Sequence, residues 1–215
     1  MPPWAPGRTI GAYMAGVFLI VAGLSVLLRV RPHCGATAIA IFFLLCVLLL
    51  HAPHMHGIIY SGVDRTRAFE PLALSGAAFA LISLFNRADR ASDWVTPMGR
   101  WLFALSMIIF GIQHFMYAEF IATLVPPWIP AHLFWVYFTG VGMIVVGLAV
   151  ITGVLGRLAA TWLGIMFLLW FLVLHLPRAI AARNNADEWN SAFVALAFSG
   201  ASFIVAKTMR TRDSA

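Results

Sequence analysis

The sequence predicts an all-α integral membrane protein, a bundle of seven transmembrane helices built from a parallel internal duplication. Composition is the first observation behind this prediction. The 215 residues are 62% hydrophobic and only 10% charged, whereas a soluble domain carries about 25% charged residues. The other two observations are a series of long apolar segments and a repeat at a constant sequence offset.

The apolar segments supply the transmembrane helices. A helix needs about 20 apolar residues to cross a bilayer. Seven segments reach or approach this length: Ile10–Leu28, Gly35–Leu50, Phe69–Phe85, Trp101–Phe120, His132–Thr152, Leu158–Leu176 and Trp189–Ala206.

The repeat relates residues 2–54 to residues 126–178 at an offset of 124, with 23 identities in 53 positions. An apolar composition alone does not place prolines, tryptophans and histidines in register, as in Pro2/Pro126, Trp4/Trp128, His51/His175 and Pro53/Pro177. We therefore expect helices 1–3 to recur as helices 5–7. Equivalent helices lie four crossings apart, which predicts a pseudo-twofold axis along the membrane normal.

This repeat divides the chain into three parts of one integrated membrane domain. Residues 1–90 form the first three-helix repeat, residues 91–123 an unpaired fourth helix, and residues 124–215 the second repeat. The second repeat opens with Pro126, Pro127 and Pro130, which exclude a helix there. Trp128 is a residue type that favours the lipid headgroup layer.

The basic residues predict the orientation in the membrane. Nine of the 14 lie on one side and five on the other, so the positive-inside rule places the N-terminus outside and the C-terminus in the cytoplasm. The excess of basic residues is thereby explained as a determinant of membrane orientation. We therefore expect the lipid bilayer as a partner, and no nucleic acid. The five basic residues expected outside are Arg8, Arg65, Arg67, Arg178 and Arg183.

Two histidines are the leading site candidates because they occupy equivalent positions in the repeat. His51 and His175 each follow an apolar run and precede a proline at the second following position. A polar ring at that depth needs a partner, so we expect both to line one outward-facing pocket. Asp64 and Glu188 also align, although an acidic residue near a helix start is favourable by itself.

A metal site is an alternative for the histidine-rich end of the first repeat. His51, His54, His56 and His114 are candidate ligands, with zinc, copper and iron not separable. Pro53 is expected to end the helix between the first two, which would spoil their convergence. Haem held by His51 and His175 on the symmetry axis is a further, less favoured alternative.

Other polar residues extend the predicted pocket. His114 and Tyr117 share a helical face at the end of the fourth helix, and Arg178 follows His175 by three residues. With Trp128 and Trp189 as a roof, they would suit an anionic or quinone-like headgroup with an apolar tail. The only lysine, Lys207, is at the predicted cytoplasmic end of helix seven, which excludes a retinal Schiff base in mid-membrane.

The C-terminal half resembles DoxX-like membrane proteins. The resemblance lies in Gly111–Tyr117, Leu124–Pro130 and Phe134–Gly140, and it is best over residues 100–206. It implies a four-helix unit in a bacterial inner membrane, associated with quinone-linked oxidoreductases. It assigns no catalytic residue.

We therefore expect a redox-associated protein of the bacterial inner membrane that binds a quinone or similar amphipathic ligand. We expect this protein to be one subunit of a membrane redox complex, such as a quinone-linked oxidoreductase. One alternative is a membrane-embedded enzyme that uses histidine acid–base or metal chemistry. The other is a structural subunit of a membrane complex without a ligand of its own.

Overall fold

All regular secondary structure in the described part of the chain is helical. The computed structural model describes residues 7–54, 59–85 and 92–209, and no strand occurs in these ranges. Seven of the described helices are long and apolar enough to cross a membrane. The chain divides into two compact units, residues 1–99 and 100–215, with the boundary inside helix α5.

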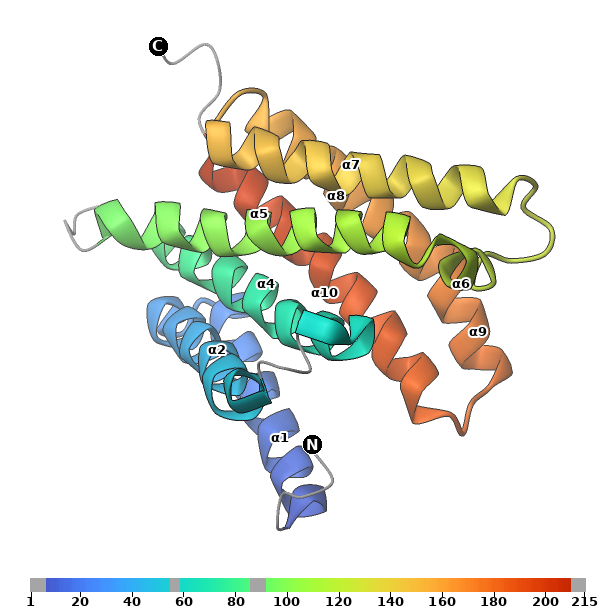
Figure 1. Ribbon diagram of the computed structural model, residues 1–215. Helices are drawn as coiled ribbons and strands as arrows, with labels where there is room; N and C mark the ends of the chain where they lie inside the picture. The colour runs from blue at the N-terminus through green and yellow to red at the C-terminus, as the bar shows by residue number, and fades with distance from the viewer. Residues whose placement is uncertain (1–6, 55–58, 86–91, 210–215) are drawn as a thin grey trace. The chain divides into compact units, whose positions relative to one another are not determined.

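The first unit is built on three long helices. α1 (Arg8–Leu27) and α4 (Gly62–Phe85) both pack against α2 (Pro32–Cys46). A π-helical turn, η1 (Val47–His51), and a 3-10 turn, η2 (Ala52–His54), extend α2 at its C-terminal end. The start of α5 (Ser92–Met116) completes the unit. Figure 1 labels the helices of this unit.

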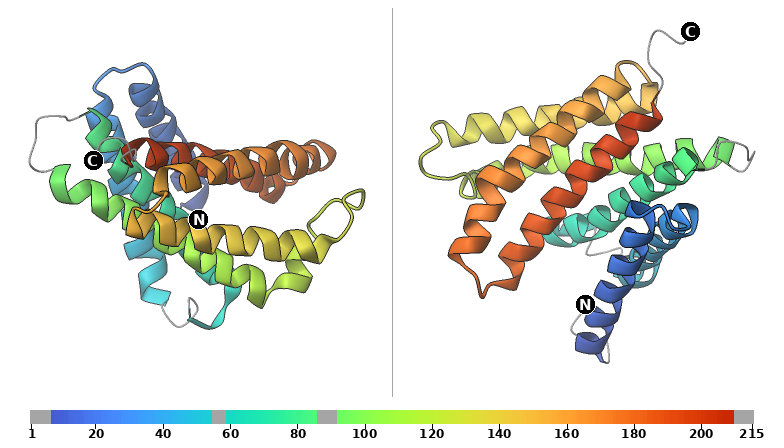
Figure 2. Two further views of the ribbon diagram at one scale, coloured as in Figure 1. Left: turned by 90° about the horizontal axis from the view of Figure 1, so that it is seen from above. Right: turned by 180° about the vertical axis from the view of Figure 1, so that it is seen from behind.

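The second unit repeats this order of elements. α8 (Gly156–Trp170) packs against both α7 (His132–Thr152) and α10 (Ala186–Thr208), and Figure 2 shows α8 and α10 side by side. The π turn η3 (Phe171–His175) and α9 (Leu176–Ala181) extend α8. The remainder of α5 and the short α6 (Ala118–Ala122) precede α7.

Three predicted helix bounds are wrong. The fourth helix begins at Ser92 rather than Trp101. The third helix begins at Gly62 rather than Phe69, because the charged segment before Phe69 is helical as well. The fourth helix does not continue to Phe120. It ends at Met116, where Tyr117 leaves the helical region with φ −121° and ψ 30°. α6 then starts as a separate element.

The elements of the two units fall at the same sequence offset of 124. α2 and α8 begin and end at equivalent residues, and so do the two π turns. α1 begins at the position equivalent to the start of α7, and α4 at the position equivalent to the start of α10.

The unusual backbone conformations follow this offset too. Every described residue with positive φ has a partner 124 positions away that also has positive φ. The three pairs are Gly7 (65°) with Ala131 (57°), Arg29 (57°) with Gly153 (76°), and Arg31 (51°) with Leu155 (54°). A left-handed conformation at a residue with a side chain costs roughly 1–2 kcal/mol, so its recurrence at equivalent positions reflects the same turn geometry in both units.

The π turns explain why the helix continues through the prolines. The predicted end of the helix at Pro53, two residues after His51, is wrong, since helical conformation runs to His54. The Ala52 amide bonds the Val47 carbonyl, five residues back, and the Leu176 amide bonds Phe171 in the same way. This wider turn ends two residues before each proline and accommodates the ring that an α-helix would reject.

Helices within each unit pack through small residues. A Cβ added at Gly99 would lie 2.5 Å from the Gly76 carbonyl oxygen, and one at Gly111 would lie 2.6 Å from the Gly140 carbonyl oxygen. Such separations are possible only without a side chain. The buried core is correspondingly rich in alanine, including Ala36, Ala40, Ala73, Ala80, Ala104 and Ala160, all fully buried.

One buried hydrogen bond joins the central helix to the last helix of the repeat in each unit. The Ser75 hydroxyl donates to the Ala40 carbonyl at 2.8 Å, and the Ser199 hydroxyl donates to the Gly164 carbonyl at 2.8 Å. Both partners of the second bond lie 124 residues after those of the first. Serine at an interface allows close approach and adds a bond between helices.

We expect Ser75→Ala and Ser199→Ala each to lower the free energy of unfolding by roughly 0.5–1.5 kcal/mol, because each removes a buried interhelical hydrogen bond. Unfolding of the purified protein in detergent, followed by circular dichroism, measures the loss. Ser191→Ala is the matched control, since the exposed Ser191 hydroxyl donates only to Asp187 of its own helix. An equal loss in the control would contradict the assignment.

Candidate ligand-binding site

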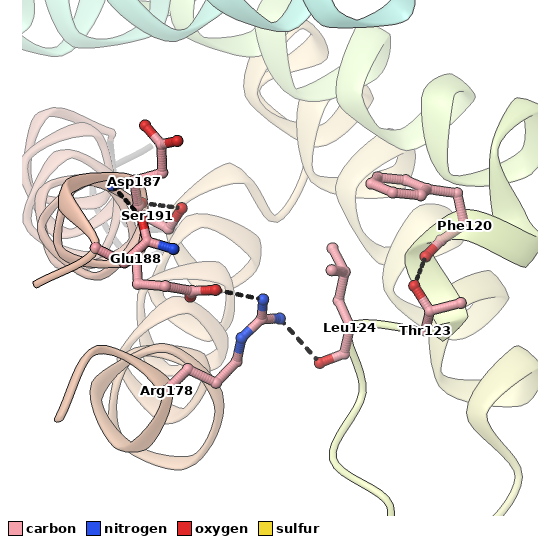
Figure 3. Close-up of polar contacts among 8 residues, drawn as sticks. Phe120, Thr123, Leu124, Arg178, Asp187, Glu188 and Ser191 are labelled. Carbon is pink, nitrogen blue, oxygen red and sulfur yellow. Dashed lines mark hydrogen bonds and ion pairs between the residues drawn. The ribbon is translucent and has the colours of Figure 1, made fainter. Parts of the chain in front are cut away.

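Arg178 joins three elements of the second unit in a polar layer. Its Nη2 atom donates to Glu188 Oε1 at 2.7 Å, and its Nη1 atom donates to the Leu124 carbonyl at 3.5 Å. Figure 3 shows the guanidinium reaching from α9 to α10 on one side and to the segment after α6 on the other. The Arg178 and Glu188 side chains are 36% and 18% exposed, so the ion pair is close to the surface but partly shielded.

Local sequence places both members of this pair. Asn185 caps α10, and its Oδ1 accepts from the Asp187 amide at 3.0 Å. The cap fixes the helix start and puts Glu188 in the first turn, where the helix dipole favours a negative charge. Pro177 follows the π turn, whose wider geometry accommodates its ring, and Arg178 comes next in the chain.

His175 lies at the end of the π turn beside this pair. Arg178 and Glu188 both act electrostatically on its ring. Its Nδ1 atom is buried and has no hydrogen-bond partner among the described residues. Buried polar atoms are normally paired, so this nitrogen lacks the hydrogen-bond partner expected of a buried atom.

An aromatic cluster joins the helices of the second unit. The His114 ring stacks on Trp170 with centroids 6.1 Å apart. Trp170 contacts Phe167 edge-on at 5.6 Å, and Phe167 stacks on Phe198 at 5.2 Å. Phe198 meets Phe110 at 5.7 Å, which brings the cluster back to α5. These rings give the unit an apolar, polarizable interior.

His114 has a structural place in this cluster. Its Nδ1 atom lies 2.8 Å from the Phe110 carbonyl, which can only accept, so Nδ1 carries the proton. A Cβ added at Gly140 would lie 2.8 Å from the His114 Cβ, so α7 packs tightly over it. This histidine helps to hold α5, α7 and α8 together.

The other predicted pocket residues are spread more widely. Tyr117 is the half-buried residue before α6, outside the helical geometry that would align it with His114. Trp128 is 71% exposed. The Trp189 indole donates to the Arg183 carbonyl at 3.0 Å and its ring stacks on Phe193. The predicted tryptophan roof stays a prediction.

The first unit holds a related arrangement around His51. Asp64, in the first turn of α4, and Arg67 both act electrostatically on the His51 ring. Asp64 and Arg67 lie 3.9 Å apart as an exposed ion pair. Ser61 precedes α4 and its hydroxyl accepts from the Asp64 amide at 3.3 Å, at the position equivalent to the cap Asn185. Each unit thus combines a histidine, an acid of the next helix and an arginine, although the arginines are not equivalent.

The predicted metal site is not formed by the described residues. No group of three or more histidine, cysteine or acidic side chains suited to a metal occurs among them. His54 Nδ1 lies 3.2 Å from its own helix at the Leu50 carbonyl, and His56 lies outside the described residues. His51 and His175 belong to separate units, so their shared pocket and the haem alternative stay predictions.

Two residues of interest were missed from the sequence. Glu70 is a half-buried carboxylate within α4, and an acid inside a predicted apolar segment was a usable signal. Nothing in the sequence around Trp170 indicated that its ring stacks on His114. Its position follows only from the packing of α5 against α8.

We expect Glu188→Gln to lower the free energy of unfolding by roughly 1–2 kcal/mol, because Arg178 loses its charged acceptor; partial exposure keeps the effect at this level. Denaturation in detergent measures it. Asp187→Asn, at the exposed neighbouring position, should stay within about 0.5 kcal/mol of the wild type. Arg178→Gln should add little to Glu188→Gln, and fully additive losses would argue against a coupled pair.

Comparison with known proteins gives one family match. Residues 103–202 match the model of a domain of unknown function (DUF8561). The matched range covers the aromatic cluster, His175 and the Arg178–Glu188 pair. No curated protein matches the chain. No solved structure matches it either.

Proposed function

We propose that the chain is a multi-pass protein of the bacterial inner membrane and that its second unit binds the head of a quinone or similar amphipathic molecule, in association with membrane redox chemistry. The membrane assignment is supported by seven helices of sufficient length and apolarity. Many large apolar side chains also face outward, such as Val17 (62% exposed), Trp162 (62%) and Phe138 (57%). Contact with lipid would cover them.

We also propose that the two units arose by duplication of one three-helix element. The matched helix starts, the recurring left-handed residues and the paired serine bonds support this origin. Under this proposal, α5 and α6 form the unpaired connection between the two copies.

The buried and unpartnered Nδ1 atom of His175 is the observation on which the ligand proposal rests. A protonated imidazole nitrogen can donate to a quinone carbonyl. Arg178, although paired with Glu188, carries further N–H donors beside it. A hydrogen bond from His175 would satisfy an atom that otherwise carries a desolvation cost of roughly 1–3 kcal/mol.

The aromatic cluster suits the apolar part of the same ligand. Trp170 is the last residue of α8, and the π turn that ends in His175 follows it directly. The aromatic cluster and the polar layer around Arg178 are therefore adjacent along one helix. A quinone has both parts, a flat ring with two carbonyl acceptors and an apolar tail. Ligand sites commonly combine apolar walls with a few placed polar groups.

We expect a short-chain benzoquinone to quench the tryptophan fluorescence of the purified full-length protein in a saturable manner. His175→Ala should weaken the affinity about tenfold, the equivalent of one hydrogen bond. His33→Ala, at the opposite predicted side, should bind as the wild type does, and circular dichroism checks that each variant is folded. Equal affinity of His175→Ala and the wild type would reject the site, and non-saturable quenching would favour a structural subunit.

The proposed topology has its own test. A tag at the N-terminus should be accessible to antibody or protease on intact spheroplasts, while a tag at the C-terminus should be protected until the membrane is opened. The expectation follows from the excess of arginine and lysine on the predicted cytoplasmic side. The reverse pattern would place His51 and His175 at the cytoplasmic end.

A further inference from the structure

Glu70 is a carboxylate inside a helix proposed to cross the membrane. It lies eight residues after the start of α4 at Gly62, about 12 Å along the helix axis. Its side chain is half-buried, and its neighbours Ala68 and Ala73 are 4% and 0% exposed. The carboxylate thus lies at the start of the apolar part of α4, directly after its charged residues Asp64, Arg65 and Arg67.

The carboxylate has no counter-charge of its own. No hydrogen bond or ion pair of Glu70 occurs among the described residues. Arg67, one turn earlier, is the charged group that acts on it, but Arg67 lies 3.9 Å from Asp64. Glu70 differs in this respect from Glu188, whose charge is matched by Arg178 at 2.7 Å.

The helix backbone beside Glu70 offers a hydrogen-bond acceptor. Pro71 lies inside α4 and has no amide to donate to the carbonyl of Arg67, four residues earlier. A protonated carboxyl group carries one O–H donor. The Glu70–Pro71 pair therefore places a potential donor next to a carbonyl that the helix leaves without its usual bond.

We propose that Glu70 is a proton-binding site within the first unit. Its carboxyl group is neutral when the proton is bound, and the proton exchanges along the charged start of α4, which holds Asp64, Arg65 and Arg67. An isolated carboxylate in an apolar medium is so costly that the group takes up a proton instead. Ionisable groups within transmembrane helices are commonly parts of proton or ion pathways. This inference is independent of the ligand proposed for the second unit.

The surroundings of the site are specific to the first unit. At the equivalent positions of α10 stand Val194 and Ala195, so neither the acid nor the proline recurs. α2 and η1 pack against α4. The described titratable or charged groups on these elements and on α4 itself are His33, Cys34, Cys46, His51, Asp64, Arg65 and Arg67.

Dicyclohexylcarbodiimide tests the proposal on the wild-type protein, since this apolar reagent reacts with protonated carboxyl groups in apolar surroundings. The full-length protein in detergent is incubated with the reagent between pH 5 and pH 9, and the modified peptides are quantified by mass spectrometry. We expect Glu70 to gain one reagent mass, with a rate that falls at least tenfold as the pH rises. Glu119, exposed on α6, and Glu188, paired with Arg178, are the internal controls and should react far less.

A matched variant and a competition experiment distinguish a proton site from a metal-cation site. Glu70→Gln should abolish this modification and leave the labelling of the control residues unchanged. Absence of Glu70 labelling across the pH range, or labelling no greater than that of Glu119, would overturn the proposal. Protection by sodium or potassium ions at constant pH and ionic strength would also overturn it, since the site would then bind a metal cation.

Discussion

Close approach of helix backbones is the constraint on which each unit depends. An amide or carbonyl of one helix can come near another helix only where side chains are absent or very small. Gly99 against Gly76, and Gly111 against Gly140, are such places. With an alanine-rich core, attraction comes from many dispersion contacts at short range rather than from a few large side chains. The serine bonds Ser75–Ala40 and Ser199–Gly164 are possible only at this spacing.

This mode of packing also determines where polar chemistry can occur. The tight helix contacts leave little space between α8 and α10 along most of their length. The charged side chains of α9 and α10 meet beyond the end of α8, where η3 and α9 follow. There the Arg178–Glu188 pair and His175 lie beyond Trp170, whose ring stacks on His114. In the first unit, the corresponding end of α2 brings His51 close to the charged start of α4.

The sequence was most informative about features that depend on local pattern. Length and apolarity predicted the seven long helices, and the repeated prolines and histidines aligned elements whose bounds correspond in the structure. Prediction failed at Tyr117 and Pro53, where backbone geometry depends on neighbouring turns rather than on a residue's own preference. Of the site, Arg178 and Glu188 were both singled out, but no pattern indicated their direct pairing or the contact of His114 with Trp170.

The π turns have a consequence for the rotational phase of the helices that contain them. Each residue of an α-helix advances the rotation by about 100°, so a turn that uses an extra residue leaves the following segment lagging. α9 therefore presents a different side to α10 than an uninterrupted α8 would. Removing a single residue from Phe171–His175 would restore the regular phase and rotate Arg178 away from Glu188. One extra residue in η3 thus determines the direction in which Arg178 points.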